Sequence, residues 1–461
     1  MLNLRFFTYV STMASQCALL DLPHELLHQV LLNVDPADLA RVRLTCAFLD
    51  QYLKKNELLF KELYLQFWDE PLEKAPTSIG PTWETRLQNV VWLQKVLASE
   101  HVHTKLNDYQ RVVQLISALL QVKDPATSKN LDFFDEAFGK LNLDTLLCRS
   151  SLFQEAGDKA HLTADTEFER QLSAKLHCYY GIPIDPRGRK SKPTHPWARS
   201  RVYDLRNYDT NTMWGPFRDD GSGRVDWEMV EAIMVVLGFN MEVLAEESDV
   251  SFGSLWAVKF RGAVPYSAPH LKCSLVNDPE LPLEARDPYG VTGTWLRVVC
   301  FLDYHDFYAF NFGSLAPADG GPRPPIDIRE AIRFIKLGIT VTKVEPPGPE
   351  DGQALPVVHF KGASRLMPAF SDPNANSELT GTVRLTREGE IRWTSFSIFQ
   401  GEERWRSEGI QVGGLCTARG VLGTWFDKDF DPHGPAGPTA FWKTSNEVDP
   451  NLGEPDEGES L

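Results

Sequence analysis

The sequence has no excess of basic residues. Its 47 lysines and arginines stand against 63 aspartates and glutamates, so the formal net charge at pH 7 is −16. Nucleic-acid binding requires clustered basic side chains that neutralise phosphates. We therefore expect no nucleic-acid partner.

Cysteine is scarce, and its spacing is irregular. Seven cysteines lie at positions 17, 46, 148, 178, 273, 300 and 416, and no two of them form a Cys-x-x-Cys motif. An odd, scattered set is typical of reduced thiols, and it argues against both a disulfide framework and a zinc site. We expect the protein in the cytoplasm, the nucleus or both.

Long apolar runs are missing as well. No run reaches the length that crosses a bilayer, so we expect no membrane partner. The first twelve residues are mildly apolar, but they are too short and poorly flanked for a secretory signal. We expect residues 1–17 to be a disordered extension, and the second methionine, Met13, is the alternative to Met1 as the true start.

The common catalytic motifs are not found. The sequence has no Gly-x-Ser-x-Gly elbow, no His-Glu-x-x-His and no glycine-rich phosphate loop followed by Lys-Ser/Thr. We therefore expect no cofactor and no enzymatic activity. Since the members of a catalytic triad need not be close in sequence, a hydrolase in the C-terminal half stays a minor alternative.

One acidic segment, residues 219–226, is similar in composition to a calcium-binding loop. If Gly223 takes the glycine position of that motif, Arg218 falls on the first ligand position and Met229 on the last. A guanidinium is a poor first ligand for a cation, so we predict a turn that leads into a helix beginning after Asp226.

Two further groups fail as metal sites. His101 and His103 would diverge on a helix. A later loop alternates acidic residues through Gly and Pro, but no acidic ligand follows at calcium-loop spacing. That loop, with Asp427, Asp429, Asp431 and His433, is predicted to be a solvated turn. We expect no metal.

An apolar helical stretch stands near the start of the chain. Leu22-Pro23 opens a helix, because proline suits the first helical turn, and Asp35-Pro36 ends it, because the residue before proline avoids the α region. Three short helices over residues 18–68 cannot bury all their large apolar side chains alone, so we expect a partner surface. The apolar positions of the first helix follow a spacing of three and four: Leu26, Leu27, Val30, Leu31 and Val34.

Residues 18–68 resemble an F-box. The Leu-Pro start, the Asp-Pro-Ala-Asp-Leu junction at 35–39 and the Arg-Leu-Thr-Cys segment at 43–46 fit the pattern of that family. The resemblance implies a three-helix domain that docks on the Skp adaptor, and through it on the cullin, of a Skp–cullin–F-box ubiquitin ligase. It assigns adaptor binding to Leu22, Pro23, Leu26, Leu27, Val30, Leu31, Leu39, Leu44 and Cys46. A plain three-helix segment packed on its own protein is the alternative.

Residues 69–184 are predicted to be a helical region, with its clearest amphipathic stripe from Tyr109 to Leu120. Residues 185–250 are predicted to hold a basic linker, a turn-rich segment and a helix. The basic cluster at 187–201 is read as a solvated linker or, alternatively, as a nuclear-import or acidic-partner patch. Asp226 caps the helix, which is predicted to run from Trp227 to Leu237 and to end at Gly238.

The period of the apolar residues changes to two in the C-terminal half. Residues 251–445 predict an antiparallel β-barrel of eight to ten strands with one inserted helix, which runs from Asp327 to Gly338 and starts with a capping box at Glu330. A turn at 386–390 joins two strands, and a bulge near Ser395 would help the sheet curl. The predicted strands are 252–260, 291–301, 307–312, 357–360, 378–385, 391–399, 409–412 and 420–426.

A Gly-Thr-Trp sequence recurs at Trp295 and Trp425, and tryptophan at the start of a strand is suited to closing a barrel end. This half is loosely similar to calycin-type barrels and to the substrate domain of F-box proteins that bind D-type cyclins. The run from 409 to 442 resembles a segment of fungal F-box proteins. Residues 446–461, acidic and without a basic residue, are predicted to be a disordered tail.

The sequence thus predicts an α+β multidomain protein that acts as the substrate-recognition subunit of a Skp–cullin–F-box ubiquitin ligase. Its F-box would dock the adaptor, and its β domain would bind a target protein that the sequence does not identify. The alternative is a barrel that binds a small ligand or a peptide end, with the F-box serving only for docking or turnover.

Overall fold

The computed structural model describes residues 19–54, 56–71, 80–122, 124, 127–141, 144–157, 159–181, 194–247, 280–313, 321–366, 376–415 and 420–452. They fall into two compact units. The N-terminal unit comprises residues 19–68 and 80–95, and the C-terminal unit comprises residues 69–71 and those from 96 onward. The predicted strand at 252–260, the basic residues 187–192, the extension 1–17 and the tail beyond 452 lie outside the described residues.

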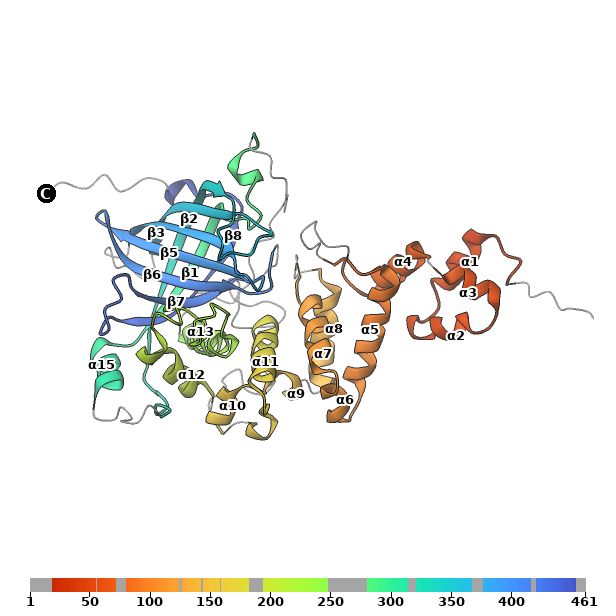
Figure 1. Cartoon of the computed structure of the whole chain (residues 1–461), viewed down its shortest axis with the longest axis horizontal. Helices are drawn as coiled ribbons and strands as arrows, with labels where there is room; N and C mark the ends of the chain where they lie inside the picture. Colours follow the sequence, from red (N-terminus) through yellow and green to blue (C-terminus); the bar gives the residue numbers. More distant parts are fainter. Residues whose placement is uncertain are drawn as a thin grey trace, which may run out of the picture. The chain divides into compact units, whose positions relative to one another are not determined.

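The N-terminal unit is built from short helices (Figure 1). Asp35 starts a 3₁₀ turn by accepting a hydrogen bond from the Ala37 amide at 2.8 Å, and Asn56 starts α4 by accepting one from the Leu59 amide at 3.2 Å. The structure has more than the three short helices predicted for residues 18–68, because α2 ends at Arg43 and α3 starts after Cys46. The elements are α1 (His24–Leu31), η1 (Pro36–Asp38), α2 (Leu39–Arg43), α3 (Ala47–Leu53), α4 (Glu57–Phe67) and the greater part of α5 (Trp83–Ala98).

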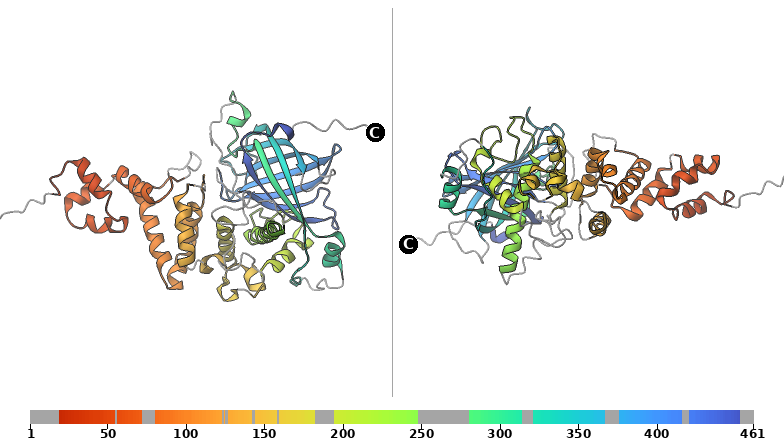
Figure 2. Two further views of the ribbon diagram at one scale, coloured as in Figure 1. Left: turned by 180° about the vertical axis from the view of Figure 1, so that it is seen from behind. Right: turned by 90° about the horizontal axis from the view of Figure 1, so that it is seen from below.

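The C-terminal unit begins with helices. They are α6 (Val102–Leu106), α7 (Tyr109–Leu119), α8 (Lys129–Leu141), α9 (Asp144–Leu147), α10 (Ser151–Glu155), η2 (Ala160–Leu162), α11 (Glu167–Tyr180), α12 (Thr194–Val202), η3 (Leu205–Asn207) and α13 (Trp227–Glu247). Helix α13 packs against α11, α12 and the barrel strands β7 and β8 (Figures 1 and 2). None of the helices among the described residues is long and apolar enough to span a membrane.

Asp226 caps α13 as predicted, since its carboxylate accepts from the amides of Glu228 and Met229 at 3.0 and 3.3 Å. The predicted end at Gly238 is wrong, because the helix continues to Glu247. Residues 229–237 are buried on all sides between the other helices and the barrel. The free energy gained by burying this helix outweighs the low helix propensity of a single glycine, Gly238.

The described part of the predicted basic linker is a buried helix. In α12, Arg199 is 4% exposed, and its Nε donates to Glu330 at 2.5 Å. Arg201 pairs with Glu155 at 2.7 Å and also donates to Ser151. Because both guanidinium groups are engaged inside the unit, neither belongs to a solvated linker or an import patch.

Eight antiparallel strands form a closed barrel in sequence order, and β1 pairs with both β2 and β8. This confirms the predicted barrel. The strands are β1 (Gly293–Phe301), β2 (Ala331–Glu345), β3 (Val357–Leu366), β4 (Ser377–Leu385), β5 (Ile391–Phe399), β6 (Glu402–Gln411), β7 (Val421–Asp427) and β8 (Ala436–Ser445). Two 3₁₀ turns, η4 (Leu283–Ala285) and η7 (Pro450–Leu452), flank them.

The predicted secondary structure is wrong for two elements: one predicted strand is a helix, and one predicted helix belongs to a strand. The predicted strand 307–312 lies in a helix, α15 (Tyr304–Phe312), which starts because the Asp303 carboxylate accepts from the His305 amide at 2.9 Å. The predicted helix 327–338 is not formed: residues 327–330 have no regular structure, and residues 331–338 are the start of β2. Its supposed capping residue, Glu330, turns inward to Arg199 and Asn240, so no capping box forms.

The local irregularity of the barrel lies close to its predicted place. The β5–β6 register shifts between Ser397 and Ile398, two residues beyond Ser395, and the extra residue, Arg404, belongs to β6. The predicted hairpin turn is present, since the Thr386 amide donates to the Glu390 carbonyl at 2.8 Å.

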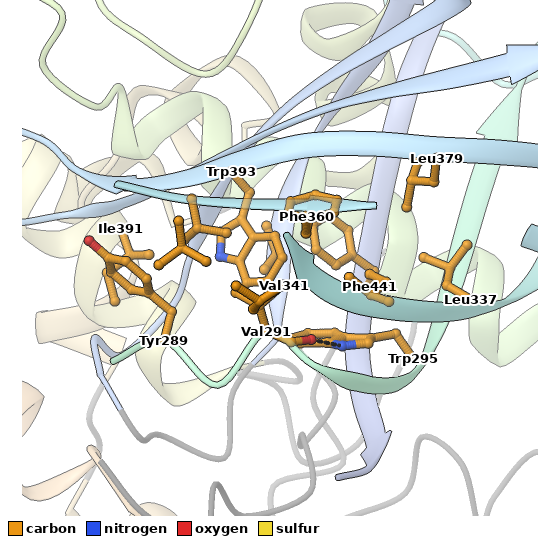
Figure 3. Packing of buried hydrophobic residues seen from close by; sticks show 14 of the residues in the cluster. Tyr289, Val291, Trp295, Leu337, Val341, Phe360, Leu379, Ile391, Trp393 and Phe441 are labelled. Atoms are coloured by element: carbon orange, nitrogen blue, oxygen red, sulfur yellow. Dashed lines mark hydrogen bonds between the residues drawn. The ribbon is translucent and has the colours of Figure 1, made fainter. Parts of the chain in front are cut away.

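An aromatic cluster fills part of the barrel interior (Figure 3). Trp295 and Trp393 meet edge to face at 5.1 Å between ring centroids, and Phe441 contacts both. Phe360 packs against Trp393. We call Trp295, Phe360, Trp393 and Phe441 the aromatic plug. Trp425 is not part of it, because its ring faces Phe301 and Trp405 instead.

Candidate partner-docking sites

Helix α1 separates its apolar side chains into two faces. Leu26 and Val30 are four residues apart and are 52% and 42% exposed. Leu27 and Leu31 lie on the other face and are buried. Since residues at i and i+4 share one side of a helix, α1 presents an apolar strip to its surroundings after its own core is complete.

The elements after α1 add further exposed apolar side chains. Leu44, at the end of α2, is 87% exposed, and Phe48, in α3, is 39% exposed. The Phe48 ring stacks on Tyr52, whose hydroxyl donates to the His24 carbonyl at 3.0 Å and so fixes α3 to the start of α1. We call Leu26, Val30, Leu44 and Phe48 the exposed apolar set.

Ion pairs hold the segments that carry this set. The Arg43 guanidinium donates to Asp50 at 2.9 Å and to Glu84 at 2.7 Å. The hydrogen bond that Arg43 donates to Asp50, together with the charges of the Glu84 and Asp50 carboxylates, raises the pKa of Arg43 above its usual range although burial opposes this. Glu57 accepts from the Trp83 amide at 2.7 Å. The turns between α2 and α5 are therefore cross-linked within the unit.

The residues predicted to bind an adaptor divide into two groups. Leu27, Leu31 and Leu39 are at most 5% exposed, so they are core residues that hold the helices together and offer no side-chain surface to a partner. Whether these three residues also take part in adaptor binding stays a prediction. Leu22 and Cys46 are half-buried, and Pro23, Leu26, Val30 and Leu44 are exposed. The spacing of apolar residues in the sequence identifies the apolar positions of a helix. It does not show which of two apolar faces is covered by the other helices of the same domain.

Helix α15 carries a second exposed apolar strip, in the C-terminal unit. Tyr304, Tyr308 and Phe312 follow one another at four-residue spacing and are 49%, 44% and 42% exposed. Their rings contact in sequence, at 6.2 and 5.0 Å between centroids, and the His433 ring lies 4.7 Å from Phe312. The prediction of a strand at 307–312 hides this strip, although the four-residue spacing of its rings is helical.

The acidic loops form turns within the described structure. Residues 217 and 225 pair as an isolated β-bridge, and Asp220 is tied to Arg224 at 2.7 Å. Asp427 and Asp431 accept from backbone amides two residues further on. His101 precedes α6, and His103 lies in it. In the part of the chain that the structure describes, no group of three His, Cys, Asp or Glu side chains is placed to hold a metal ion.

The helices of the N-terminal unit thus form a small domain that exposes an apolar surface for another protein. Residues 19–66 match the family model of the F-box-like domain, so the chain carries an F-box-like domain at this place. F-box domains typically bind the Skp adaptor of cullin ubiquitin ligases, and proteins that carry them are generally non-catalytic. No curated protein and no solved structure gives a significant match to the chain. The resemblances of the barrel to calycins, to cyclin-binding F-box proteins and to fungal proteins stay predictions.

Proposed function

We propose that this chain is the substrate-recognition subunit of a Skp–cullin–F-box ubiquitin ligase, working in the cytoplasm, the nucleus or both. The observation that carries the proposal is the exposed apolar set on an F-box-like domain, with Leu44 87% exposed. Full burial of an exposed leucine or phenylalanine is worth about 1.5–3 kcal/mol, so covering this set by the Skp adaptor supplies the driving force for docking.

The chain acts by proximity in this proposal. The adaptor and cullin bring the charged conjugating enzyme, and the C-terminal unit brings the target. Holding both on one assembly turns the encounter of lysine and thioester into an event at high effective concentration. The chain itself then needs no catalytic residue.

The α15 strip supports target binding by the C-terminal unit. Exposed tyrosine and phenylalanine side chains are enriched at the centres of protein interfaces, because they bury a large area at a low entropic cost. Asp303 and Asp431 are exposed beside the rings, so a target segment with both apolar and basic side chains would complement the strip.

Co-purification with the Skp adaptor tests the docking half of the proposal. Full-length protein is expected to bring down the adaptor, and a Leu22→Ala/Pro23→Ala variant to bring down less. Failure of the wild type would make the proposal wrong. The target half is tested by proximity labelling in cells with the full chain and a Tyr308→Ser/Phe312→Ser variant, which is expected to lose labelled proteins while it keeps the adaptor. Identical labelling by both would exclude the α15 strip.

A further inference from the structure

A polar pocket lies outside the barrel, beside the first turn of α13. Its walls come from α12, η3, the turn that precedes α13 and the segment 322–323 ahead of β2. Its volume is about 250 Å³, and its lining carries five carboxylates and three guanidinium groups. Pockets for drug-sized ligands measure about 300–1,000 Å³, so this one has room for a single side chain.

The three arginines of the pocket are bound to two of its carboxylates. Asp204 accepts hydrogen bonds from Arg206 at 2.6 Å and from Arg323 at 3.1 Å. Glu155 accepts from Arg201 at 2.7 Å. The other three carboxylates of the lining therefore have no arginine of the pocket at hydrogen-bond distance, and they leave the pocket with an excess of negative charge.

Two of these three carboxylates, Asp226 and Glu228, each use only one of their oxygens. Oδ1 of Asp226 accepts from the Gln171 side chain at 2.7 Å and from two backbone amides of α13. Glu228 is 8% exposed, and its Oε1 accepts from the amide and the hydroxyl of Ser151 at 2.6 and 2.7 Å. Among the described residues the second oxygen of each carboxylate accepts no hydrogen bond, and both of these oxygens are accessible to solvent.

The negative charge of these groups is only partly compensated. The Nε of Arg170 is 3.8 Å from the Glu228 carboxylate, which is beyond hydrogen-bond distance. Burial raises the pKa of Asp226, and the charge of Glu228 adds to this effect, although Gln171 and Arg201 oppose it. Because a buried charge is costly unless an opposite charge compensates it, a cation in the pocket would stabilise both carboxylates.

An aromatic side chain, Trp197, lines the same pocket. It is half-buried on α12, one helical turn before Arg201. Its ring makes no aromatic or cation contact with another described residue. Phe217 also lines the pocket, but the Arg392 guanidinium already lies over its ring at 4.9 Å. Trp197 is therefore the ring that is available to a cation beside the carboxylates.

We propose that this pocket binds the basic side chain of an arginine or a lysine of another protein, with Asp226 and Glu228 as the counter-ions and Trp197 as the aromatic wall. Both side chains combine an apolar stem, which packs on an indole, with a terminal cation that donates to carboxylate oxygens. A metal ion fits less well, because no group of three His, Cys, Asp or Glu side chains in the described chain is placed to hold one.

The wall of the pocket is joined to α15. Arg323 donates to the Phe310 and Asn311 carbonyls at 2.7 and 3.1 Å, so the pocket and the α15 strip belong to the same part of the C-terminal unit. The inference rests on the proposed function in one respect, namely that the basic side chain belongs to a target protein. Binding in the pocket itself does not require the adaptor.

Nuclear magnetic resonance of the full chain, labelled with ¹⁵N at its tryptophan indoles, tests the proposal. The spectrum of Trp197→Phe identifies the Trp197 signal. Titration with N-acetyl-arginine amide and with N-acetyl-lysine amide should shift this signal saturably, and the probe that binds more tightly identifies the side chain. N-acetyl-citrulline amide, which has the shape of the arginine probe without its charge, should bind at least about tenfold more weakly.

Two variants remove one charge each and keep the local hydrogen bonds. In Asp226→Asn the new side chain can still cap α13, and in Glu228→Gln the amide oxygen can still accept from Ser151. Each should weaken binding of the basic probe at least about tenfold. Asp220→Asn is the matched control, because Asp220 does not line the pocket and is already paired with Arg224 at 2.7 Å. It should bind like the wild type.

The other indole signals show whether each variant keeps the native fold. The proposal is overturned if neither basic probe causes a saturable shift, if the citrulline probe binds as tightly as the arginine probe, or if either natively folded pocket variant binds like the wild type. A wild type that binds a basic probe but not the Skp adaptor would contradict the proposed function and leave the pocket assigned. The two failures are therefore distinguishable.

Discussion

The F-box-like helices expose several of their large apolar side chains, whereas the barrel buries its own. In the helices, Leu44 is 87% and Leu58 is 60% exposed after the core is complete. In the barrel interior, Trp393 is 1% and Trp295 is 4% exposed. A domain that leaves such side chains in water is completed by a partner, whereas a closed barrel completes its own core and has no free sheet edge.

Charged groups show the reverse distribution. The F-box-like helices keep theirs at the surface, as in the pair of Arg41 and Asp38. The barrel carries Arg297, Glu408 and Lys443 at 6%, 0% and 3% exposure. Buried charges contribute little to net stability, so they point to binding or to structural specificity. The comparison thus separates exposed apolar side chains in the F-box-like helices from buried charged side chains in the barrel strands.

The largest effect is expected at the aromatic plug. Trp393→Ala removes a side chain that contacts Trp295, Phe360 and Phe441, and it should lower the free energy of unfolding by about 3–5 kcal/mol. Chemical denaturation followed by tryptophan fluorescence measures this change. A loss below about 1 kcal/mol would contradict the tight packing of this section.

Two neighbouring leucines of α1 offer a matched pair. Leu27→Ala should cost about 2–5 kcal/mol of stability, because Leu27 is 0% exposed. Leu26→Ala should change stability by less than about 1 kcal/mol, because Leu26 is already half in water. Circular dichroism during urea unfolding measures both. Equal losses would mean that the two faces of α1 are not distinct.

Asp287 should give the barrel a pH-dependent stability. Burial raises the pKa of its carboxyl to about 6, although the Val291 and Tyr289 amides and the Lys443 charge oppose this. Between pH about 4 and 6 the folded state then holds a proton that the unfolded state has lost, so stability falls as pH rises through this window, by up to about 3 kcal/mol. The measurement is the difference in unfolding free energy between the wild type and Asp287→Asn across pH 4–7. A difference that does not change with pH would contradict the assignment.

The smallest effect on stability is expected at the α15 strip. Tyr308→Ser should change the free energy of unfolding by no more than about 0.5 kcal/mol, because the ring is 44% exposed. Thermal unfolding monitored by circular dichroism tests this. A large loss would make the strip part of the fold and not a surface for a target.

The sequence predicts those elements in which local and long-range signals agree. Strand β5 is found at its predicted bounds, because alternation and the turn at 386–390 act together. Prediction from the sequence fails where a local pattern competes with a tertiary contact. Glu330 looks like a capping residue, but the buried guanidinium of Arg199, 131 residues away in sequence, attracts it instead.

The candidate sites also combine features that the local sequence predicts with features that depend on the tertiary structure. The pattern of apolar residues identifies the F-box-like domain, but the choice between Leu26 and Leu27 as docking residue depends on which face the neighbouring helices cover. Arg297 was not identified at all, because a single arginine within an apolar strand carries no motif. Its two hydroxyl partners come from β6 and β8, and the local sequence around Arg297 does not reveal that the barrel brings them to it.

Isothermal titration calorimetry with purified Skp adaptor measures whether the exposed apolar set binds the adaptor. Leu26→Glu/Leu44→Glu should weaken binding by at least about tenfold while the circular dichroism spectrum stays that of the wild type, since desolvated contacts of this size are each worth about 1–3 kcal/mol. Phe168→Glu, at a side chain 55% exposed on α11 of the other unit, is the matched control and should bind like the wild type. Equal affinities of the double variant and the wild type would show that Leu26 and Leu44 do not bind the adaptor. A wild type that does not bind the adaptor would show that the F-box-like domain does not dock on it.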